Sequence, residues 1–257
     1  MSAKSVQYGQ LPVDFISGLG IQNDPINPNT VLDIFYGRTL DSSFTYQLAM
    51  EEPTFRRVDS SIIGIGGLDK GPLLPNKVYG IYIAWNPINR NDIDAFISSS
   101  YYHPTVPYGY DAVKLIGYVA TDASSNFRQA RWNLYGNSAY RNMMYAPQVP
   151  VLTNGTANTQ TVVNLISYIP NIGAQIVNLE LSFTSSTPGN ALTIYSDMGD
   201  FNLYAQAANI PNTTFTNLVV TKEILIANVV SPVISYSVTN SGTDSASIYC
   251  NGYDFFL

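Results

Sequence analysis

The chain contains little charge. Only 12% of its 257 residues are Asp, Glu, Lys or Arg, about half of the usual share. Uncharged polar side chains must therefore form much of the surface, and the sequence supplies 24 Asn and 19 Tyr. A hydrophobic share of 46% excludes intrinsic disorder, which needs low hydrophobicity and high charge. The net charge of −6 argues against a protein that binds nucleic acid by neutralising phosphates.

Histidine and cysteine are almost missing, since the chain has only His103 and Cys250. This excludes a zinc site built from clustered His and Cys, and a disulfide framework within the chain. No segment approaches the roughly 18 apolar residues of a membrane span. The first residues lack the apolar core of a secretory signal. We therefore expect a chain that is made in a cytoplasm and does not insert into a membrane.

The sequence offers no complete catalytic set. His103 is the only ordinary base near neutral pH, and no Gly-x-Ser-x-Gly elbow accompanies it, so a hydrolase would depend on this residue alone. Cys250 has no nearby His and is expected to be a small buried apolar residue. The glycines of residues 64–71 lack the Gly-Lys-Ser/Thr ending of a phosphate loop. We predict a protein without catalytic residues or cofactors.

The sequence contains two pairs of closely spaced acids: Asp92 with Asp94, and Asp197 with Asp200. A glycosidase needs two carboxylates, but both pairs lie in polar, turn-like sequence, where Asp satisfies backbone groups. We therefore predict no metal site, although a cation site at Asp197 and Asp200 stays open without the spacing of an EF-hand.

The local pattern is that of β-strands almost throughout. Residues 176–183 alternate between apolar and polar side chains, which is the period of a strand with one solvated face. Residues 233–238 and 245–250 flank a turn and predict a hairpin, and so do residues 112–120 and 127–132. No window sustains a helical period with caps at both ends, and 15 Pro and 18 Gly suit turns between strands. We predict an all-β chain with little helix.

Charge divides the sequence into two parts. Residues 1–145 hold 11 of the 12 cations, whereas residues 146–257 hold only Lys222. The join is rich in Pro, Gly and Asn, where linkers concentrate. We predict two β-sandwich or jelly-roll-like domains, 1–148 and 149–257. A single continuous sandwich is the alternative, since β domains of this length exist.

Tyrosines are concentrated in one part of the chain. A Pro- and Gly-rich segment and the polar segment after it contain Tyr101, Tyr102, Tyr108, Tyr110, Tyr135, Tyr140 and Arg141. Tyr and Arg are enriched at protein interfaces, and the amphipathic Tyr ring also stacks on sugars. We predict an interaction or glycan-binding surface at these residues. The alternative is that the tyrosines cap the edge of a small core.

Three motifs follow one another within residues 60–132. They are Gly67-Leu-Asp-Lys-Gly with a Tyr-rich segment that ends at Asn86-Pro, then Pro104-Thr-Val-Pro-Tyr-Gly-Tyr, then Leu115-Ile-Gly-Tyr-Val-Ala-Thr-Asp. Together with the ending Asn251-Gly-Tyr, this order resembles a module of tailed-bacteriophage virion proteins. Such modules occur in fibres, tail appendages, collars and head decorations.

The resemblance implies a structural component of a bacteriophage virion that acts in particle assembly or host attachment. It implies a homo-oligomer, with a trimer favoured, and other virion proteins of the capsid, neck or tail as partners. A host surface glycan is a further candidate partner. The expected location is the virion, after synthesis in the host cytoplasm.

No long fibrous region follows the module, which favours a compact fibre head, collar adaptor or capsid-decoration protein over a tailspike. We expect the more charged domain, 1–148, to dock to the particle, and the domain 149–257 to face outward or pack against its copies. The alternative function is a carbohydrate-binding module or lectin that recognises host glycans through exposed tyrosines.

Overall fold

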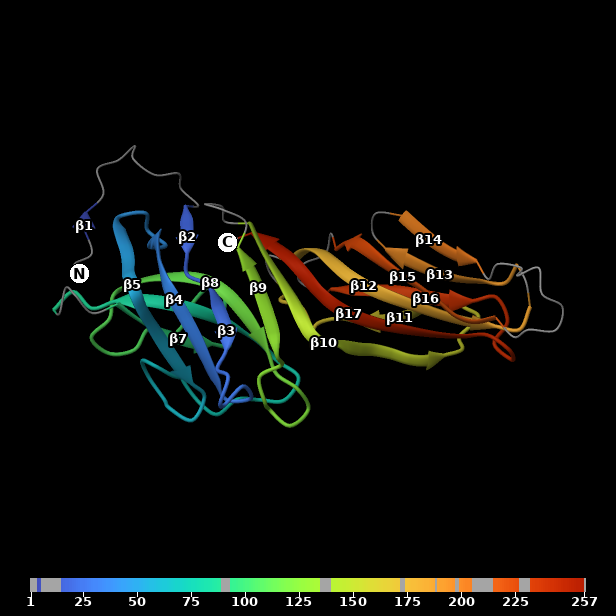
Figure 1. Cartoon of the computed structure of the whole chain (residues 1–257), viewed down its shortest axis with the longest axis horizontal. Helices are drawn as coiled ribbons and strands as arrows, with labels where there is room; N and C mark the ends of the chain where they lie inside the picture. The colour runs from blue at the N-terminus through green and yellow to red at the C-terminus, as the bar shows by residue number, and fades with distance from the viewer. Residues whose placement is uncertain are drawn as a thin grey trace. The chain divides into compact units, whose positions relative to one another are not determined.

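The computed structural model describes residues 4–5, 15–88, 93–134, 140–171, 174–187, 189–196, 199–204, 215–226 and 232–256. These residues form strands, turns and loops and contain no helix, so the prediction of an all-β chain is confirmed (Figure 1). In this described part, no helix is long and apolar enough to cross a membrane.

The chain divides into two compact units. Unit 1 comprises residues 1–146 with 255–257, and unit 2 comprises residues 147–254. Each unit contains antiparallel strands that belong to two sheets.

The larger sheet of unit 1 has the strand order β1-β5-β4-β3-β9-β10, and β2 also pairs with β4. Its strands are β1 (Lys4–Ser5), β2 (Ile16–Gly18), β3 (Ile21–Asn23), β4 (Val31–Leu40), β5 (Tyr46–Asp59), β9 (Ala130–Leu134) and β10 (Tyr140–Gly155). The smaller sheet has the order β7-β6-β8, with β6 (Val78–Trp85), β7 (Ile93–Ser98) and β8 (Ala112–Ala120).

The central strand of the smaller sheet, β6, is buried along its whole length. Its sequence is apolar on both faces, which is what a strand covered on both sides requires. Tyr82 stacks on Phe96 of the neighbouring strand at a centroid distance of 5.2 Å. Gly80 makes room for this packing, because a Cβ there would lie 2.9 Å from side-chain atoms of both Leu115 and Tyr82.

Unit 2 is a β-sandwich. One sheet contains the second part of β10, followed in order by β17 (Ser245–Phe256), β12 (Ala174–Ser185) and β15 (Phe215–Leu225). The other has the order β11-β16-β13-β14, with β11 (Thr161–Asn164), β13 (Ala191–Ser196), β14 (Gly199–Tyr204) and β16 (Val233–Val238). Yellow to red strands in Figure 1 show these elements.

The core of unit 2 follows the alternation of the sequence. On β12 the buried apolar side chains are those of Val177, Leu179, Leu181 and Phe183, and on β17 they include those of Ala246, Ile248 and Cys250. The burial of Cys250 is thus confirmed. The predicted solvated face of residues 176–183 is confirmed only in part, because Glu180 and Ser182 are partly exposed whereas Asn178 is buried.

The hairpin predicted for residues 233–250 is wrong, and the one predicted for residues 112–132 is confirmed only at its turn. β16 pairs with β11 and β13, whereas β17 belongs to the opposite sheet of the sandwich. Residues 239–244 therefore connect two sheets instead of two paired strands. In unit 1, Thr121 and Phe127 form a single antiparallel bridge, after which β9 joins the larger sheet and leaves β8 in the smaller one. The period-two alternation identifies a strand and its buried face. It does not show whether the next strand pairs with it in a hairpin or belongs to another sheet.

Candidate functional site

The structure separates the tyrosines that follow β7. Tyr102 is 69% exposed and Tyr108 is fully exposed. Tyr101 is turned inward, where its hydroxyl donates to the carbonyl oxygen of Val78 at 2.7 Å and its ring meets Tyr118 edge-on. Burial raises the pKa of Tyr101 well above its ordinary range. Tyr101 therefore supports the core, whereas Tyr102 and Tyr108 present their rings to solvent.

The remaining members of the predicted surface lie elsewhere. Tyr110 packs partly buried against the cluster around Tyr82 and Phe96. Arg141 is only 2% exposed and donates hydrogen bonds to the carbonyl oxygens of Leu19 and Gly18, at 3.2 Å each. Burial lowers the pKa of Arg141 to about 10. This guanidinium fastens the turn between β2 and β3 and is not part of the exposed surface.

Several predicted positions lie outside the described residues: Tyr135, Asp92, Asp197, and the side chains of Tyr140 and Asp200. Within the described part of the chain, no group of three His, Cys, Asp or Glu side chains could hold a metal ion. His103 lies in an exposed loop, where its backbone N–H donates to Ser100 Oγ at 3.2 Å.

The first of the three motifs of residues 60–132 is hydrogen-bonded to each of the other two. Asp69 of the first motif is buried and accepts a hydrogen bond from the backbone N–H of Thr105, in the second motif, at 3.0 Å. Thr121 of the third motif donates from Oγ1 to the carbonyl oxygen of Leu74 at 2.7 Å. It also accepts from the N–H of Lys77 at 3.0 Å. These motifs are therefore interdependent parts of one structural module in unit 1.

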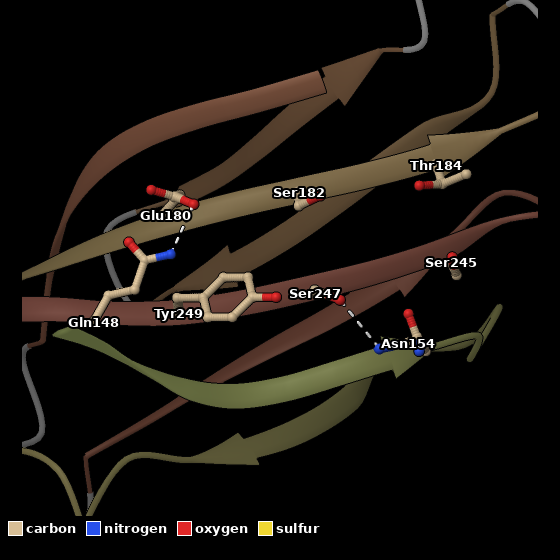
Figure 2. A pocket seen from close by; sticks show the side chains of 8 residues that line it. All are labelled: Gln148, Asn154, Glu180, Ser182, Thr184, Ser245, Ser247 and Tyr249. Carbon is tan, nitrogen blue, oxygen red and sulfur yellow. Dashed lines mark hydrogen bonds between the residues drawn. The ribbon is translucent and has the colours of Figure 1, made fainter. Parts of the chain in front are cut away.

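A pocket of about 390 Å³, which we call the polar hollow, lies on one face of the β10-β17-β12 sheet of unit 2. Eight side chains from three neighbouring strands line it: Gln148 and Asn154 of β10, Ser245, Ser247 and Tyr249 of β17, and Glu180, Ser182 and Thr184 of β12. Figure 2 shows these side chains along the three strands.

The alternation of side chains along each strand directs these residues toward the polar hollow. Successive side chains point to opposite faces of a sheet, so the lining residues of β12 and β17 alternate with buried core residues. Ser247 and Tyr249, for example, flank the buried Ile248. Tyr249 and its neighbours were not predicted as a site from the sequence. The alternation in residues 245–250 is the signal that gives their common face.

Neutral hydrogen-bonding groups dominate the polar hollow. Gln148 Nε2 donates to Glu180 Oε1 at 3.0 Å, and the backbone N–H of Asn154 donates to Ser247 Oγ at 3.2 Å. None of the eight lining side chains is cationic, and Glu180 is the only acid among them. Hydroxyl groups both donate and accept hydrogen bonds, so this surface can match a ligand that carries many uncharged polar groups.

Comparisons with known proteins place the chain in no family. No protein-family profile and no curated protein matches it. Among solved structures, the VP2 subviral particle of infectious bursal disease virus is 14% identical over 99% of this chain and 70% of that chain, with a TM-score of 0.28. A tryptic core variant of Cry1Da from Bacillus thuringiensis is 8% identical over 93% of this chain and 50% of that chain, with a TM-score of 0.25. TM-scores at this level carry no argument about the fold or the function.

Proposed function

We propose that the protein is a structural component of a bacteriophage virion that acts in particle assembly or host attachment and performs no catalysis. The proposal is supported chiefly by the ordered motifs of residues 60–132, which resemble a virion module. The hydrogen bonds from Thr105 to Asp69 and from Thr121 to Leu74 join segments distant in sequence. The segments that carry the three motifs are therefore in contact in the folded chain, as parts of one module would be.

The composition is consistent with a chain that works in an assembly. The cores of protein interfaces are depleted of charged residues and enriched in Tyr, and this chain combines 12% charged residues with 19 Tyr. Virion positions repeat by symmetry, and closed symmetric oligomers are the usual solution for such positions. The favoured assignments are a compact fibre head, a collar adaptor and a capsid-decoration protein.

The copy number of the chain in purified particles tests the proposal. Quantitative mass spectrometry against the major capsid protein would measure it. A count similar to that of the capsid protein indicates a decoration protein, and a small multiple of the tail or vertex symmetry indicates a fibre, collar or adaptor. Absence from particles would overturn the virion assignment.

We further propose that unit 1 docks to the particle through the loop between β5 and β6. Ile62 and Ile63 are adjacent there and are 46% and 61% exposed, so they offer a pair of apolar side chains for a partner to cover. Replacing both residues by Ser is expected to lower the copy number in particles. Ile26→Ser is the matched control, because Ile26 is exposed in a different turn of unit 1. Equal copy numbers for both variants and the wild type would contradict this docking assignment.

A carbohydrate-binding module is the second candidate function, and the exposure of Tyr102 and Tyr108 favours it. Absence of the chain from particles, together with glycan binding that is lost in Tyr102→Ala or Tyr108→Ala, would favour this candidate over the first.

A further inference from the structure

The polar hollow of unit 2 has no role in the functions described so far. Its side chains lie on the sheet face opposite the sandwich core, so they do not build the core. Its volume of about 390 Å³ falls within the range of small-ligand sites, about 300–1,000 Å³. Such sites are usually lined by apolar groups, whereas Tyr249 is the only lining residue with a large apolar surface.

The charges of the hollow restrict the class of ligand. Phosphate, sulfate and carboxylate groups are bound by Arg, Lys or clustered N–H donors, and the lining contains no cationic side chain. The Glu180 carboxylate would repel such anions. Calcium takes six to eight oxygen ligands and favours several carboxylates, and Glu180 is the only acid in the lining. A neutral ligand rich in hydroxyl groups fits these constraints.

The arrangement of the side chains suits the two faces of a sugar ring. The Glu180 carboxylate has about four acceptor positions, so it can accept from Gln148 Nε2 and also from ligand hydroxyls. Tyr249 supplies an aromatic ring with a polar end, which can contact the C–H face of a sugar while its hydroxyl bonds to the ligand or the sheet. Ser182 and Ser247 add hydroxyls on the neighbouring strands.

The hollow is also pre-organised. Its side chains project from three strands of one sheet, and sites on such elements hold their geometry better than sites on loops. Ser and Thr are short, so they lose less rotamer freedom on binding than Lys or Arg would. We propose that the polar hollow binds a neutral oligosaccharide, with Tyr249 contacting the apolar face of one sugar and Glu180 accepting hydrogen bonds from its hydroxyls. This proposal rests on the attachment role of the proposed function, to which it adds a ligand class and a site.

The test is an array of neutral and acidic oligosaccharides probed with the purified full-length chain. The variants are Tyr249→Ala, Tyr249→Phe and Glu180→Gln. Tyr36→Ala serves as the matched control, because Tyr36 is an exposed tyrosine of unit 1. We expect the wild type to bind a subset of the neutral glycans. Tyr249→Ala and Glu180→Gln should weaken this binding about tenfold or more, Tyr249→Phe should retain most of it, and Tyr36→Ala should leave it unchanged.

Three results would overturn the proposal: binding to no oligosaccharide, binding to acidic oligosaccharides alone, and binding that Tyr108→Ala abolishes while Tyr249→Ala preserves it. Loss of folding in Tyr249→Ala would expose the thiol of the adjacent Cys250, which is buried in the native protein. If a thiol-labelling reagent modifies Cys250 in Tyr249→Ala, that variant has lost its fold, and the binding of Tyr249→Phe and Glu180→Gln then decides the outcome. The array uses the isolated protein and the copy-number measurement uses particles, so the glycan site and the virion assignment can fail independently.

Discussion

At the scale of single residues, the turn between β2 and β3 places a strict requirement on the sequence. Gly18 has a φ of +68° and Leu19 a φ of +57°, in a region that residues with a Cβ seldom adopt. A Cβ at Gly18 would also lie 2.6 Å from the carbonyl oxygen of Tyr36. The carbonyl groups of both turn residues accept hydrogen bonds from the buried Arg141, which supports the turn from inside.

We predict that Gly18→Ala is clearly more destabilising than Gly71→Ala. Gly71 has a similar φ of +64°, but a Cβ there would meet nothing within 4 Å. Gly71→Ala should therefore cost only the conformational strain, about 1 kcal/mol, and Gly18→Ala should add a backbone clash. Urea unfolding followed by the fluorescence of Trp85 and Trp132, both buried in unit 1, measures both changes. Equal losses in the free energy of unfolding for the two variants would show that the backbone at Tyr36 shifts to accept the added methyl group without a measurable cost.

Arg141 also shows where reasoning from the sequence stops at this scale. Its neighbours in the chain are polar, which suggested an exposed interface residue. Its partners are the carbonyl groups of Gly18 and Leu19, more than 120 residues away, and no local pattern reports such a contact. Burial of Cys250 was predictable, in contrast, because the residue continues a period-two alternation with Ala246 and Ile248.

At the scale of elements, strands and their buried faces were predictable and their partners were not. The alternation in residues 176–183 and 245–250 indicates which side chains share a face, including Glu180 and Tyr249 of the polar hollow. It does not indicate that β12 and β17 are neighbours, because pairing depends on residues far away in the chain. For the same reason the local pattern after β16 predicts a hairpin, although the connection passes from one sheet to the other.

That connection is held by Asp244, which is buried. Its carboxylate accepts hydrogen bonds from Ser185 Oγ at 2.7 Å, from Asn190 Nδ2 at 2.9 Å and from the N–H of Asn240 at 2.9 Å. Burial alone would raise the pKa of Asp244, but these hydrogen bonds favour the charged form and together lower the pKa below its ordinary value of 3.8. Because the folded state has the lower pKa, the stabilisation is present above about pH 4 and is lost as the pH falls further.

We predict that Asp244→Asn lowers the free energy of unfolding by about 1–3 kcal/mol at pH 7. The difference between variant and wild type should shrink below about pH 4. Urea unfolding followed by circular dichroism at pH 7 and pH 3 measures this difference. Faster labelling of the buried Cys250 thiol at pH 7 would assign the loss of stability to unit 2. Asp122→Asn is the matched control, because Asp122 accepts backbone hydrogen bonds in a turn of unit 1. A difference between Asp244→Asn and the wild type that persists unchanged at pH 3 would contradict the role of the Asp244 charge.

At the scale of the whole molecule, the uneven charge of the sequence acquires a structural meaning. Unit 2 contains one cation, Lys222, and six acids, whereas the cations of the chain are otherwise all in unit 1. Unit 2 therefore has few means of attracting anions or of forming ion pairs. We therefore expect contacts of this unit with copies or ligands to depend mainly on apolar burial and neutral hydrogen bonds.

This reasoning leads to a prediction about assembly. We expect the purified chain to form a homo-oligomer, with a trimer of three times 28.2 kDa favoured, and we expect its mass to be insensitive to salt. Charge–charge contacts at a surface weaken strongly between about 0.05 and 0.5 M salt, whereas apolar contacts and neutral hydrogen bonds do not. Size-exclusion chromatography with light scattering over that salt range measures the mass. A monomer at every concentration would contradict the assembly, and an oligomer that dissociates as salt is added would show that its interface depends on charged residues.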